Sequence, residues 1–264
     1  MTEDSFTSLV GRTIIVTGVA SGIGRAIALL LAERGANLAM TDRSEDAGKE
    51  LLENLKAKFP SQELAFEPLD LQDVDGIARL VETFNARFKR LDGLANCAGA
   101  NIPSPIAHEV DDKLWEITTN VNQRAVWLLQ KHFIAAVLGK KGKEEAPAGG
   151  YSIVTVGSMA SLQGGPTFAA YVGTKHAVLG YTRAISKEYA TENIRVNLVA
   201  PGNIETPMFN QVISEDKRAA VVDSVPMKRM GEAVEIAKAV AFLLSSEASY
   251  ITGAYLPVDG GVTA

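Results

Sequence analysis

The sequence predicts an α/β fold in which about seven parallel strands form one doubly wound sheet with helices on both faces. Three observations lead to this prediction. Short runs rich in β-branched and apolar residues alternate with helical patterns along the whole chain. A glycine-rich segment joins the first of these strands to the first helix. Residues with useful chemistry stand at the ends of strands, which is where ligands bind in sheets of this kind.

The expected elements follow one another from the N-terminus to the C-terminus. The predicted strands are Thr13–Val16, Asn37–Thr41, Leu64–Glu67, Gly93–Asn96, Ser152–Val156, Arg195–Val199 and Ala254–Val258. The predicted helices are Arg25–Gly35, Glu45–Lys58, Val74–Phe88, Lys113–Leu138 and Ala169–Tyr189. The segment Gly139–Gly150 reads as a solvated loop or as a partner-docking loop. We find no linker, repeat or low-complexity tract, so a single domain over residues 1–264 is expected.

The segment Thr17–Gly24 connects the first predicted strand to the first predicted helix. Its glycines would let the backbone approach a pyrophosphate, and the helix N-terminus would supply free N–H groups. The Gly-x-x-x-Gly-x-Gly spacing differs from the commoner Gly-x-Gly-x-x-Gly fingerprint, and a glycine turn alone can be only a tight connection. The strand and helix on its two sides favour a dinucleotide site, formed by Gly18, Ser21, Gly22, Ile23 and Gly24.

The second predicted strand ends at Asp42, eighteen residues after Gly24. An acidic side chain at this place accepts hydrogen bonds from the adenosine ribose of a dinucleotide, and it repels a 2′-phosphate. Asp42 and Ser21 therefore favour NAD over NADP as the cofactor. Arg43 would favour NADP if it turned toward a 2′-phosphate, but it can equally be a solvated charge in the turn.

Tyr171 and Lys175 stand four residues apart in a predicted helix, and Ser158 precedes the tyrosine by thirteen residues. Side chains at i and i+4 share a helix face, with Cβ atoms about 5–6 Å apart. The ammonium group would favour the phenolate, which can exchange a proton with an alcohol or a carbonyl near neutral pH. A Tyr-x-x-x-Lys pair alone also occurs on ordinary solvated helix faces.

With these motifs, the chain resembles the single-domain, cofactor-first type of the short-chain dehydrogenase/reductase family over nearly its whole length. The further motifs that carry the resemblance are Asp70, Asn96-Cys97-Ala98-Gly99, Asn122, Pro201-Gly202-Asn203-Ile204-Glu205-Thr206 and Asp259-Gly260-Gly261, in the family's order. Cys97 replaces the family's usual second asparagine, which is expected to change packing beside the cofactor but not the chemistry. The resemblance implies a Rossmann-like fold and a nicotinamide-dependent oxidoreductase.

The resemblance also implies a catalytic set, which consists of Asn122, Ser158, Tyr171 and Lys175. Tyr171 would take the hydroxyl proton of a secondary alcohol while a hydride passes to the nicotinamide, and each step would reverse in reduction. Lys175 would favour the phenolate and bind the nicotinamide ribose. Ser158 would donate a hydrogen bond to the substrate oxygen. Asn122 would hold a water that links Lys175 to solvent.

The same resemblance extends the cofactor site beyond the glycine turn and Asp42. Asp70 and the Leu71 backbone would bind the adenine, although Asp70 alone reads as an acid at a helix N-terminus. Ile204 and Thr206 would bind the nicotinamide carboxamide. The rest of the implied cofactor set is Arg43, Asn96, Ala98, Gly99, Tyr171, Lys175, Pro201 and Gly202.

Composition limits the partners and the compartment that we expect. The net charge of −5 and pI of about 5.4 give no general attraction to nucleic acid or to an anionic membrane. No apolar stretch reaches the ~18 residues of a membrane span, and no His/Cys/Asp group has metal-ligand spacing. Cys97 is the only cysteine, so no internal disulfide can form, and it is expected to be buried. The acidic segment Met1–Ser8 is unlike a targeting peptide, and a cytoplasmic location is expected.

A substrate lid is expected from about Thr206 to Pro226. Its apolar side chains, Met208, Phe209, Val212 and Ile213, favour a fairly hydrophobic small-molecule substrate. Met159, Gln163, Phe168 and Asn203 are expected to border the same pocket. Core packing explains several of these apolar residues equally well.

Two other functions and an assembly are open at this point. An NADPH-dependent carbonyl reductase would use the same four catalytic residues, and a non-catalytic dinucleotide-binding protein would not need them together. The family resemblance implies a homo-oligomer, with a homotetramer built on helices 113–138 and 169–189 as the expected form. A monomer could also bury the apolar faces of those helices.

Overall fold

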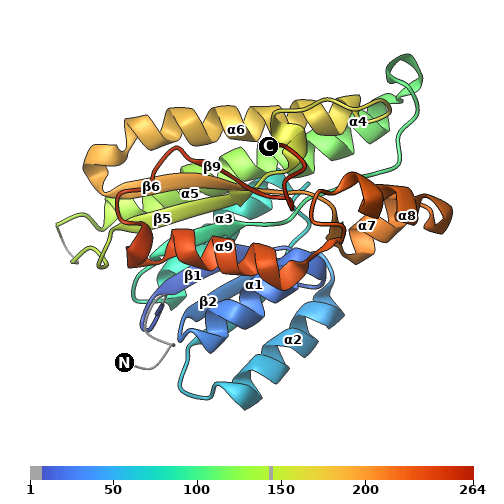
Figure 1. Cartoon of the computed structure of the whole chain (residues 1–264). Helices are drawn as coiled ribbons and strands as arrows, with labels where there is room; N and C mark the ends of the chain where they lie inside the picture. The colour runs from blue at the N-terminus through green and yellow to red at the C-terminus, as the bar shows by residue number, and fades with distance from the viewer. Residues whose placement is uncertain (1–7, 143–144) are drawn as a thin grey trace.

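The computed structural model describes residues 8–142 and 145–264 of the chain (Figure 1). Residues 1–7, on which the prediction about targeting rests, lie outside the described part. Residues 143 and 144 of the predicted loop 139–150 also lie outside it.

Seven strands of the described residues form one sheet, in the order β3-β2-β1-β4-β5-β6-β9. The strands are β1 (Thr13–Thr17), β2 (Asn37–Asp42), β3 (Leu64–Pro68), β4 (Gly93–Asn96), β5 (Tyr151–Val156), β6 (Ile194–Pro201) and β9 (Tyr255–Val258). Every pair of neighbours in this sheet is parallel. The predicted doubly wound sheet is therefore confirmed, and each predicted strand lies within two residues of the observed one.

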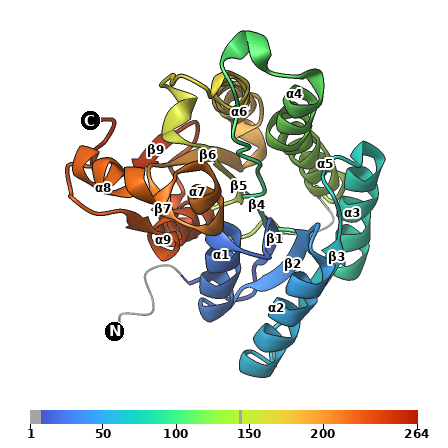
Figure 2. The same cartoon turned by 90° about the vertical axis from the view of Figure 1, so that its right-hand side faces the viewer.

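Helices cover both faces of the sheet (Figures 1 and 2). One face carries α1 (Gly22–Glu33), α2 (Glu45–Lys58) and α9 (Ala233–Leu244), and the other carries α3 (Val74–Arg87), α5 (Ala125–Gly139) and α6 (Ala169–Glu188). The central strand β1 shows why two layers form. Ile14 and Val16 point into the layer of α1 and α9, whereas Ile15 points into the layer of α3 and α5. All three are fully buried, as expected when alternate residues of a strand face opposite sides.

The long helix predicted at Lys113–Leu138 is interrupted in the structure. It consists of α4 (Asp112–Thr119), a π-helical turn (Asn120–Arg124) and α5, which follow one another without a break in helical backbone. A π-helical turn contains one residue more than an α-helical turn and is often found at functional sites. Asn122 lies in the middle of it and is 1% exposed. The prediction of one regular helix is thus wrong at this turn.

The segment after β6 contains elements that the sequence did not predict. Here β7 (Ile204–Glu205) and β8 (Gly231–Glu232) pair in parallel, and α7 (Pro207–Val212) and α8 (Glu215–Ser224) lie between them. Figure 2 shows β7, α7 and α8 close together. No helix among the described residues combines the length and the apolar character that crossing a membrane requires.

Candidate active site

A cavity of about 830 Å³ lies at the carboxyl edge of the sheet. Its walls come from the segments that follow β1, β2, β3, β4, β5 and β6, and from α6 and α7. Ligand cavities in proteins usually measure about 300–1,000 Å³, so this one can hold a large ligand. The convergence of strand ends on one rim, which the sequence predicted, places the candidate residues around this single space.

The glycine turn after β1 forms one end of the cavity. Gly18 has a φ of +77°, and a Cβ at this position would lie 2.8 Å from the Cα of Ala98. A Cβ on Gly24 would lie 2.0 Å from the Gly18 carbonyl oxygen. Both positions therefore require glycine. Helix α1 begins at Gly22, and the side chain of the preceding Ser21 does not cap it. Its first N–H groups can therefore bind an anionic ligand, so this cradle fits a dinucleotide pyrophosphate.

Two loops are joined beside this cradle by Thr17, the last residue of β1. Its Oγ1 accepts hydrogen bonds from the backbone N–H groups of Cys97 and Ala98, each at 3.0 Å. The loop after β4 is thereby held against the glycine turn. Cys97 contributes a backbone donor to this arrangement, a group that is independent of its side chain.

Asp42 lies at the end of β2 and lines the cavity. Its Oδ2 accepts a hydrogen bond from Ala20 N at 3.0 Å, and its Oδ1 accepts one from Ser44 N at 2.9 Å. The carboxylate thus connects the glycine turn to the turn before α2. Arg43 lines the same part of the cavity. The acidic and the basic residue that favour opposite cofactors are neighbours in the structure as well as in the sequence.

Asp70 and Leu71 line the cavity beyond Asp42. The Oδ1 of Asp70 accepts a hydrogen bond from Gln72 N at 2.9 Å. The N-cap of α3 is Asp73, whose side chain accepts from Gly76 N at 3.0 Å. The alternative role of Asp70 as the capping acid of this helix is therefore taken by Asp73.

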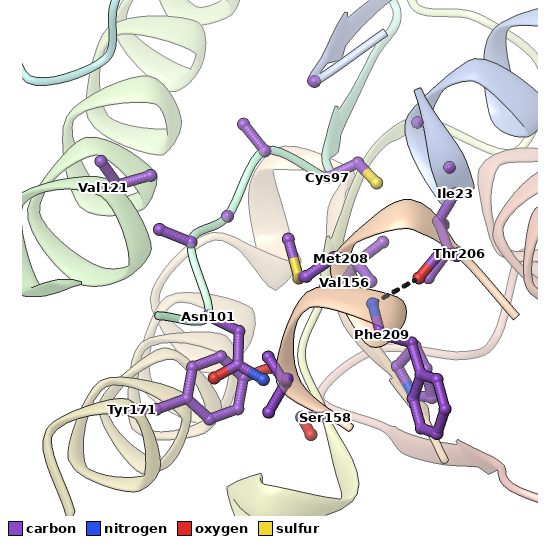
Figure 3. Close-up of a pocket in the computed structure, with 18 of the residues that line it drawn as sticks. Ile23, Cys97, Asn101, Val121, Val156, Ser158, Tyr171, Thr206, Met208 and Phe209 are labelled. Carbon is purple, nitrogen blue, oxygen red and sulfur yellow. Dashed lines mark hydrogen bonds between the residues drawn. The ribbon is translucent and has the colours of Figure 1, made fainter. Parts of the chain in front are cut away.

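Tyr171, Lys175 and Ser158 meet at the other end of the cavity, and Figure 3 shows the tyrosine and the serine in its lining. The Nζ of Lys175 lies 5.5 Å from the centre of the Tyr171 ring and donates to the Val156 carbonyl at 3.0 Å. Ser158 follows β5, and its Oγ accepts from Ala160 N at 3.1 Å. Strand β5 therefore positions the serine directly and the lysine through a backbone bond.

Asn122 fixes the loop after β4 through two hydrogen bonds. Its Oδ1 accepts from Ala100 N, and its Nδ2 donates to the Ala100 carbonyl, both at 2.7 Å. A Cβ on Gly99 would lie 3.3 Å from this Oδ1, so the preceding glycine allows the close approach. Asn122 does not line the cavity.

Of the residues predicted for the site, all except Asn96 and Asn122 line the cavity. The lining residues among them are Gly18, Ser21, Gly22, Ile23, Gly24, Asp42, Arg43, Asp70, Leu71, Ala98, Gly99, Ser158, Tyr171, Lys175, Pro201, Gly202, Ile204 and Thr206. Asn96 is 2% exposed, and neither polar atom of its side chain has a hydrogen-bond partner among the described residues. Its side chain lies inside the protein, behind the cavity wall.

The substrate end of the cavity has an apolar side and a side with amides. The apolar side includes Met208, Phe209, Val212 and Ile213 from the segment around α7, as well as Met159 and Phe168. The predicted border residues Gln163 and Asn203 also line it. Thr206 caps α7 by accepting from Phe209 N at 3.2 Å, and the bond is drawn in Figure 3. The Thr206-Pro207 pair is a helix-start signal that could have revealed α7 in the sequence.

Several polar residues of the lining were not among the predicted site residues, including Thr41, Ser44, Cys97 and Asn101. Cys97 was expected only to pack beside the cofactor, and burial raises the pKa of its thiol to about 12. Asn101, two residues after Gly99, also lines the cavity. Its position in the loop after β4 is the only signal that the sequence contains. Among the described residues, no group of three or more His, Cys, Asp or Glu side chains is arranged to hold a metal ion.

Comparison with known proteins adds to this geometry. A family profile described as Enoyl-(Acyl carrier protein) reductase matches residues 18–263. The 3-oxoacyl-[acyl-carrier-protein] reductase FabG of Salmonella typhimurium is 36% identical over 255 residues, which cover 97% of this chain and 98% of that protein.

Two solved structures are similar over nearly the whole chain. One is described as an NAD(P) dependent gluconate 5-dehydrogenase from Beutenbergia cavernae with bound NADP at low occupancy. It has a TM-score of 0.88 and 36% identity and covers 97% of this chain and 98% of its own. The other is a 3-ketoacyl-(acyl-carrier-protein) reductase from Brucella melitensis complexed with NADH. It has a TM-score of 0.88 and 29% identity, over 97% of this chain and 100% of its own.

Proposed function

The chain belongs to the short-chain dehydrogenase/reductase family, and from this premise we propose that it interconverts a secondary alcohol and a ketone with NAD(H), using Tyr171 as the general acid/base. Family membership makes it an oxidoreductase that acts on CH–OH groups with a nicotinamide dinucleotide. One observation carries the finer proposal. Tyr171, Lys175 and Ser158 line the same cavity as the glycine turn, so a dinucleotide and a substrate can meet there.

The chemistry of the chain's own residues follows from their contacts. The dinucleotide, when bound, accepts or supplies the hydride. Tyr171 removes the hydroxyl proton in oxidation and returns it in reduction. Lys175 places its ammonium 5.5 Å from the centre of the tyrosine ring, in a buried position where its charge is poorly screened. Its proposed role is to stabilise the negative charge that develops on the tyrosine oxygen during proton transfer. Ser158 offers its hydroxyl to the substrate oxygen and stabilises charge that develops there.

The residues that would hold the dinucleotide line the remaining length of the cavity. The glycine turn would bind the pyrophosphate, Asp42 the adenosine ribose, and Asp70 with Leu71 the adenine. Ile204 and Thr206 would bind the carboxamide of the nicotinamide. The proton relay through Asn122 stays a prediction. Its side-chain amide is bonded at both ends to Ala100, so holding the loop after β4 is the role that its contacts support.

The cofactor preference rests on Asp42. Its carboxylate lines the cavity next to the glycine turn and would repel a 2′-phosphate, which supports NAD over NADP. Arg43 lines the cavity beside it, and this position supports the alternative of an NADPH-dependent carbonyl reductase with the same catalytic residues.

The substrate that we propose is a small, fairly hydrophobic molecule covered by a lid at residues 206–226. The apolar side chains of α7, which line the cavity, support both parts of this proposal. We also propose a homo-oligomer, of which a homotetramer is the expected form, located in the cytoplasm. Trp115 on α4 and Trp127 on α5 are 54% and 43% exposed, and such large apolar side chains are typical of interfaces. A solution mass equal to one chain would contradict the oligomer.

The experiment that tests the reaction follows reduced-nicotinamide absorbance with a panel of secondary alcohols and ketones, with NAD(H) and NADP(H) in parallel. The panel includes gluconate and a 3-oxoacyl thioester, because similar proteins are named for them. Turnover should prefer NAD(H) and should vanish in Tyr171→Phe. Tyr181→Phe is the matched control on the same helix, since its hydroxyl bonds Gln123 outside the cavity. Equal turnover in Tyr171→Phe would refute the mechanism, and turnover with NADP(H) alone would favour the carbonyl reductase.

A further inference from the structure

The amide oxygen of Asn101 has no hydrogen-bond partner in the part of the chain that the structure describes. Asn101 lines the substrate end of the cavity, and its Oδ1 is buried without a hydrogen bond to any described residue. Ser158 differs, because its Oγ already accepts a hydrogen bond from Ala160 N. A buried amide oxygen without a partner is unfavourable in the free protein, and a ligand that supplies a donor removes this penalty.

The backbone next to Asn101 is held in place. Asn122 binds both the N–H and the carbonyl of Ala100 at 2.7 Å, and Asn122 is itself 1% exposed. The residue before Asn101 is therefore fixed at two points by a buried side chain. A polar group on a fixed backbone loses little conformational freedom when it binds a ligand.

Asn101 points to the place where the reaction would occur. Figure 3 shows the side chains of Asn101, Tyr171 and Ser158 in the same part of the cavity lining. Tyr171 and Ser158 account for the oxygen that reacts. A third polar side chain at this place can bind a second polar atom on the substrate, beside the apolar Val156 and Met208 of the same lining.

From this arrangement we propose that Asn101 determines specificity by binding a second substrate oxygen, on the carbon next to the one that reacts. The substrates would be vicinal diols in oxidation and α-hydroxyketones in reduction, with an otherwise apolar skeleton. A hydroxyl group can donate to the amide oxygen and accept from the amide nitrogen, and rotation of the amide presents either atom. The proposal rests on the proposed function, because it assigns the reacting oxygen to Tyr171 and Ser158.

The test compares ketones that differ only in the second oxygen. The probes are 2-hydroxycyclohexanone against cyclohexanone, and 3-hydroxy-2-butanone against 2-butanone. Binding to the enzyme–NADH complex is followed by NADH fluorescence, and turnover is followed by absorbance. The wild type should bind the hydroxyketone of each pair about 10- to 100-fold more tightly, and Asn101→Leu should abolish this preference. Affinity for the plain ketones and for NADH should change by no more than about threefold.

Asn85→Leu is the matched control. Asn85 on α3 also has a buried side-chain oxygen without a partner among the residues described, but it does not line this cavity. This variant should keep the wild-type preference, which separates a binding role from a general effect of an unpaired amide. Equal or unmeasurable binding of both ketones by the wild type, or an unchanged preference in Asn101→Leu, would overturn the proposal. If the binding preference holds but neither ketone is reduced, the proposed reaction fails while the assignment of Asn101 stands.

Discussion

The two edges of the sheet both contain buried polar groups. At the amino edge, the charged residues Arg12, Asp92 and Arg195 lie at the starts of β1, β4 and β6. At the carboxyl edge, the same three strands end beside the cavity. All three charged residues are at least 94% buried. Asn101 at the opposite edge also has a buried polar group. The two edges differ in what these groups bind.

The polar groups of the amino edge bind the protein itself. Arg195 donates to the carbonyls of Leu243 and Ser245 at the end of α9, each at 2.9 Å, and to Gly149 at 3.1 Å. Arg12 donates to Leu244 at 3.1 Å. Burial, together with the charge of Arg12, lowers the pKa of Arg195 to about 10. Arg195 therefore stays charged at neutral pH, and its guanidinium holds the last turn of α9 against the sheet.

The polar groups of the carboxyl edge leave bonding capacity for a ligand. Lys175 is bonded to one strand carbonyl. Within residues 8–142 and 145–264, the first turn of α1 has no side-chain cap and the Asn101 oxygen has no partner. The comparison teaches that burial alone does not separate structural from functional polar residues in this protein. The number of protein partners, taken together with a position in the cavity wall, does separate them. Substitutions at the two edges should therefore have opposite consequences.

The largest effect is expected from Lys175→Met at the carboxyl edge. Loss of the ammonium beside Tyr171 should lower kcat by about 10²–10⁴-fold, the usual range for general acid–base catalysis. The free energy of unfolding should stay the same or rise slightly, because a buried charge is replaced by an apolar chain of similar length. Steady-state kinetics and thermal unfolding measure both, with Lys187→Met on the exposed side of α6 as the control. A stable and fully active Lys175→Met would end the catalytic assignment.

Arg195→Met at the amino edge should lower the free energy of unfolding and leave kcat unchanged. Removing the guanidinium leaves several buried carbonyls without donors, so the free energy of unfolding should fall by about 2–5 kcal/mol. The kcat per folded molecule should not change, because the cavity lies at the other edge. Denaturant titration is the measurement, and Arg183→Met, on the exposed surface of α6, is the control. Unchanged stability would contradict the structural role of this edge.

A smaller effect is expected for Asp42→Asn, which removes the charge but keeps the size of the side chain. The preference for NAD⁺ over NADP⁺, measured as the ratio of the two kcat/KM values, should fall about tenfold because repulsion of the 2′-phosphate is lost. Asp46→Asn, at the exposed start of α2, should leave the ratio unchanged. A wild type that already prefers NADP⁺ would shift the interpretation to Arg43.

The smallest effect is expected for Cys97→Ala. Burial raises the pKa of the thiol to about 12, so the side chain is neutral at every pH at which the enzyme would work. Activity should stay within about threefold of the wild type, and the pH–rate profile below pH ~10 should be unchanged. An inflection in that profile that disappears in Cys97→Ala would show that the thiol takes part in the chemistry.

Much of the fold could be predicted because parallel strands buried on both faces are nearly continuous apolar runs, as in Val154 and the residues around it. The cavity lining could be predicted for the residues at strand ends, since the topology brings those ends together. The same argument predicted that Asn96 belongs to the site, but Asn96 does not line the cavity. It is the last residue of a strand that is buried throughout, so the sequence pattern does not reveal which face its side chain occupies.

Other features depend on contacts between distant segments. Asn101 and Asn122 are separated by 21 positions, and only the folded chain shows that both act on the loop after β4. The π-helical turn escaped prediction because Asn120–Arg124 contains neither proline nor glycine, the usual signals of an irregular helix. The pairing of β7 with β8 involves two residues from each strand, too few to give a periodic pattern.

That π-helical turn sets the phase of the helix that follows it. Each residue of an α-helix advances the chain by about 100° around the axis, so one additional residue rotates everything beyond it by that angle. This rotation determines which side of α5 faces the core, and that side contains Phe133 and Val137. Deleting one residue inside 120–124 would leave a continuous helix but turn those side chains away from the core. The number of residues in this stretch therefore cannot change by even one, also at positions where the type of residue is free to vary.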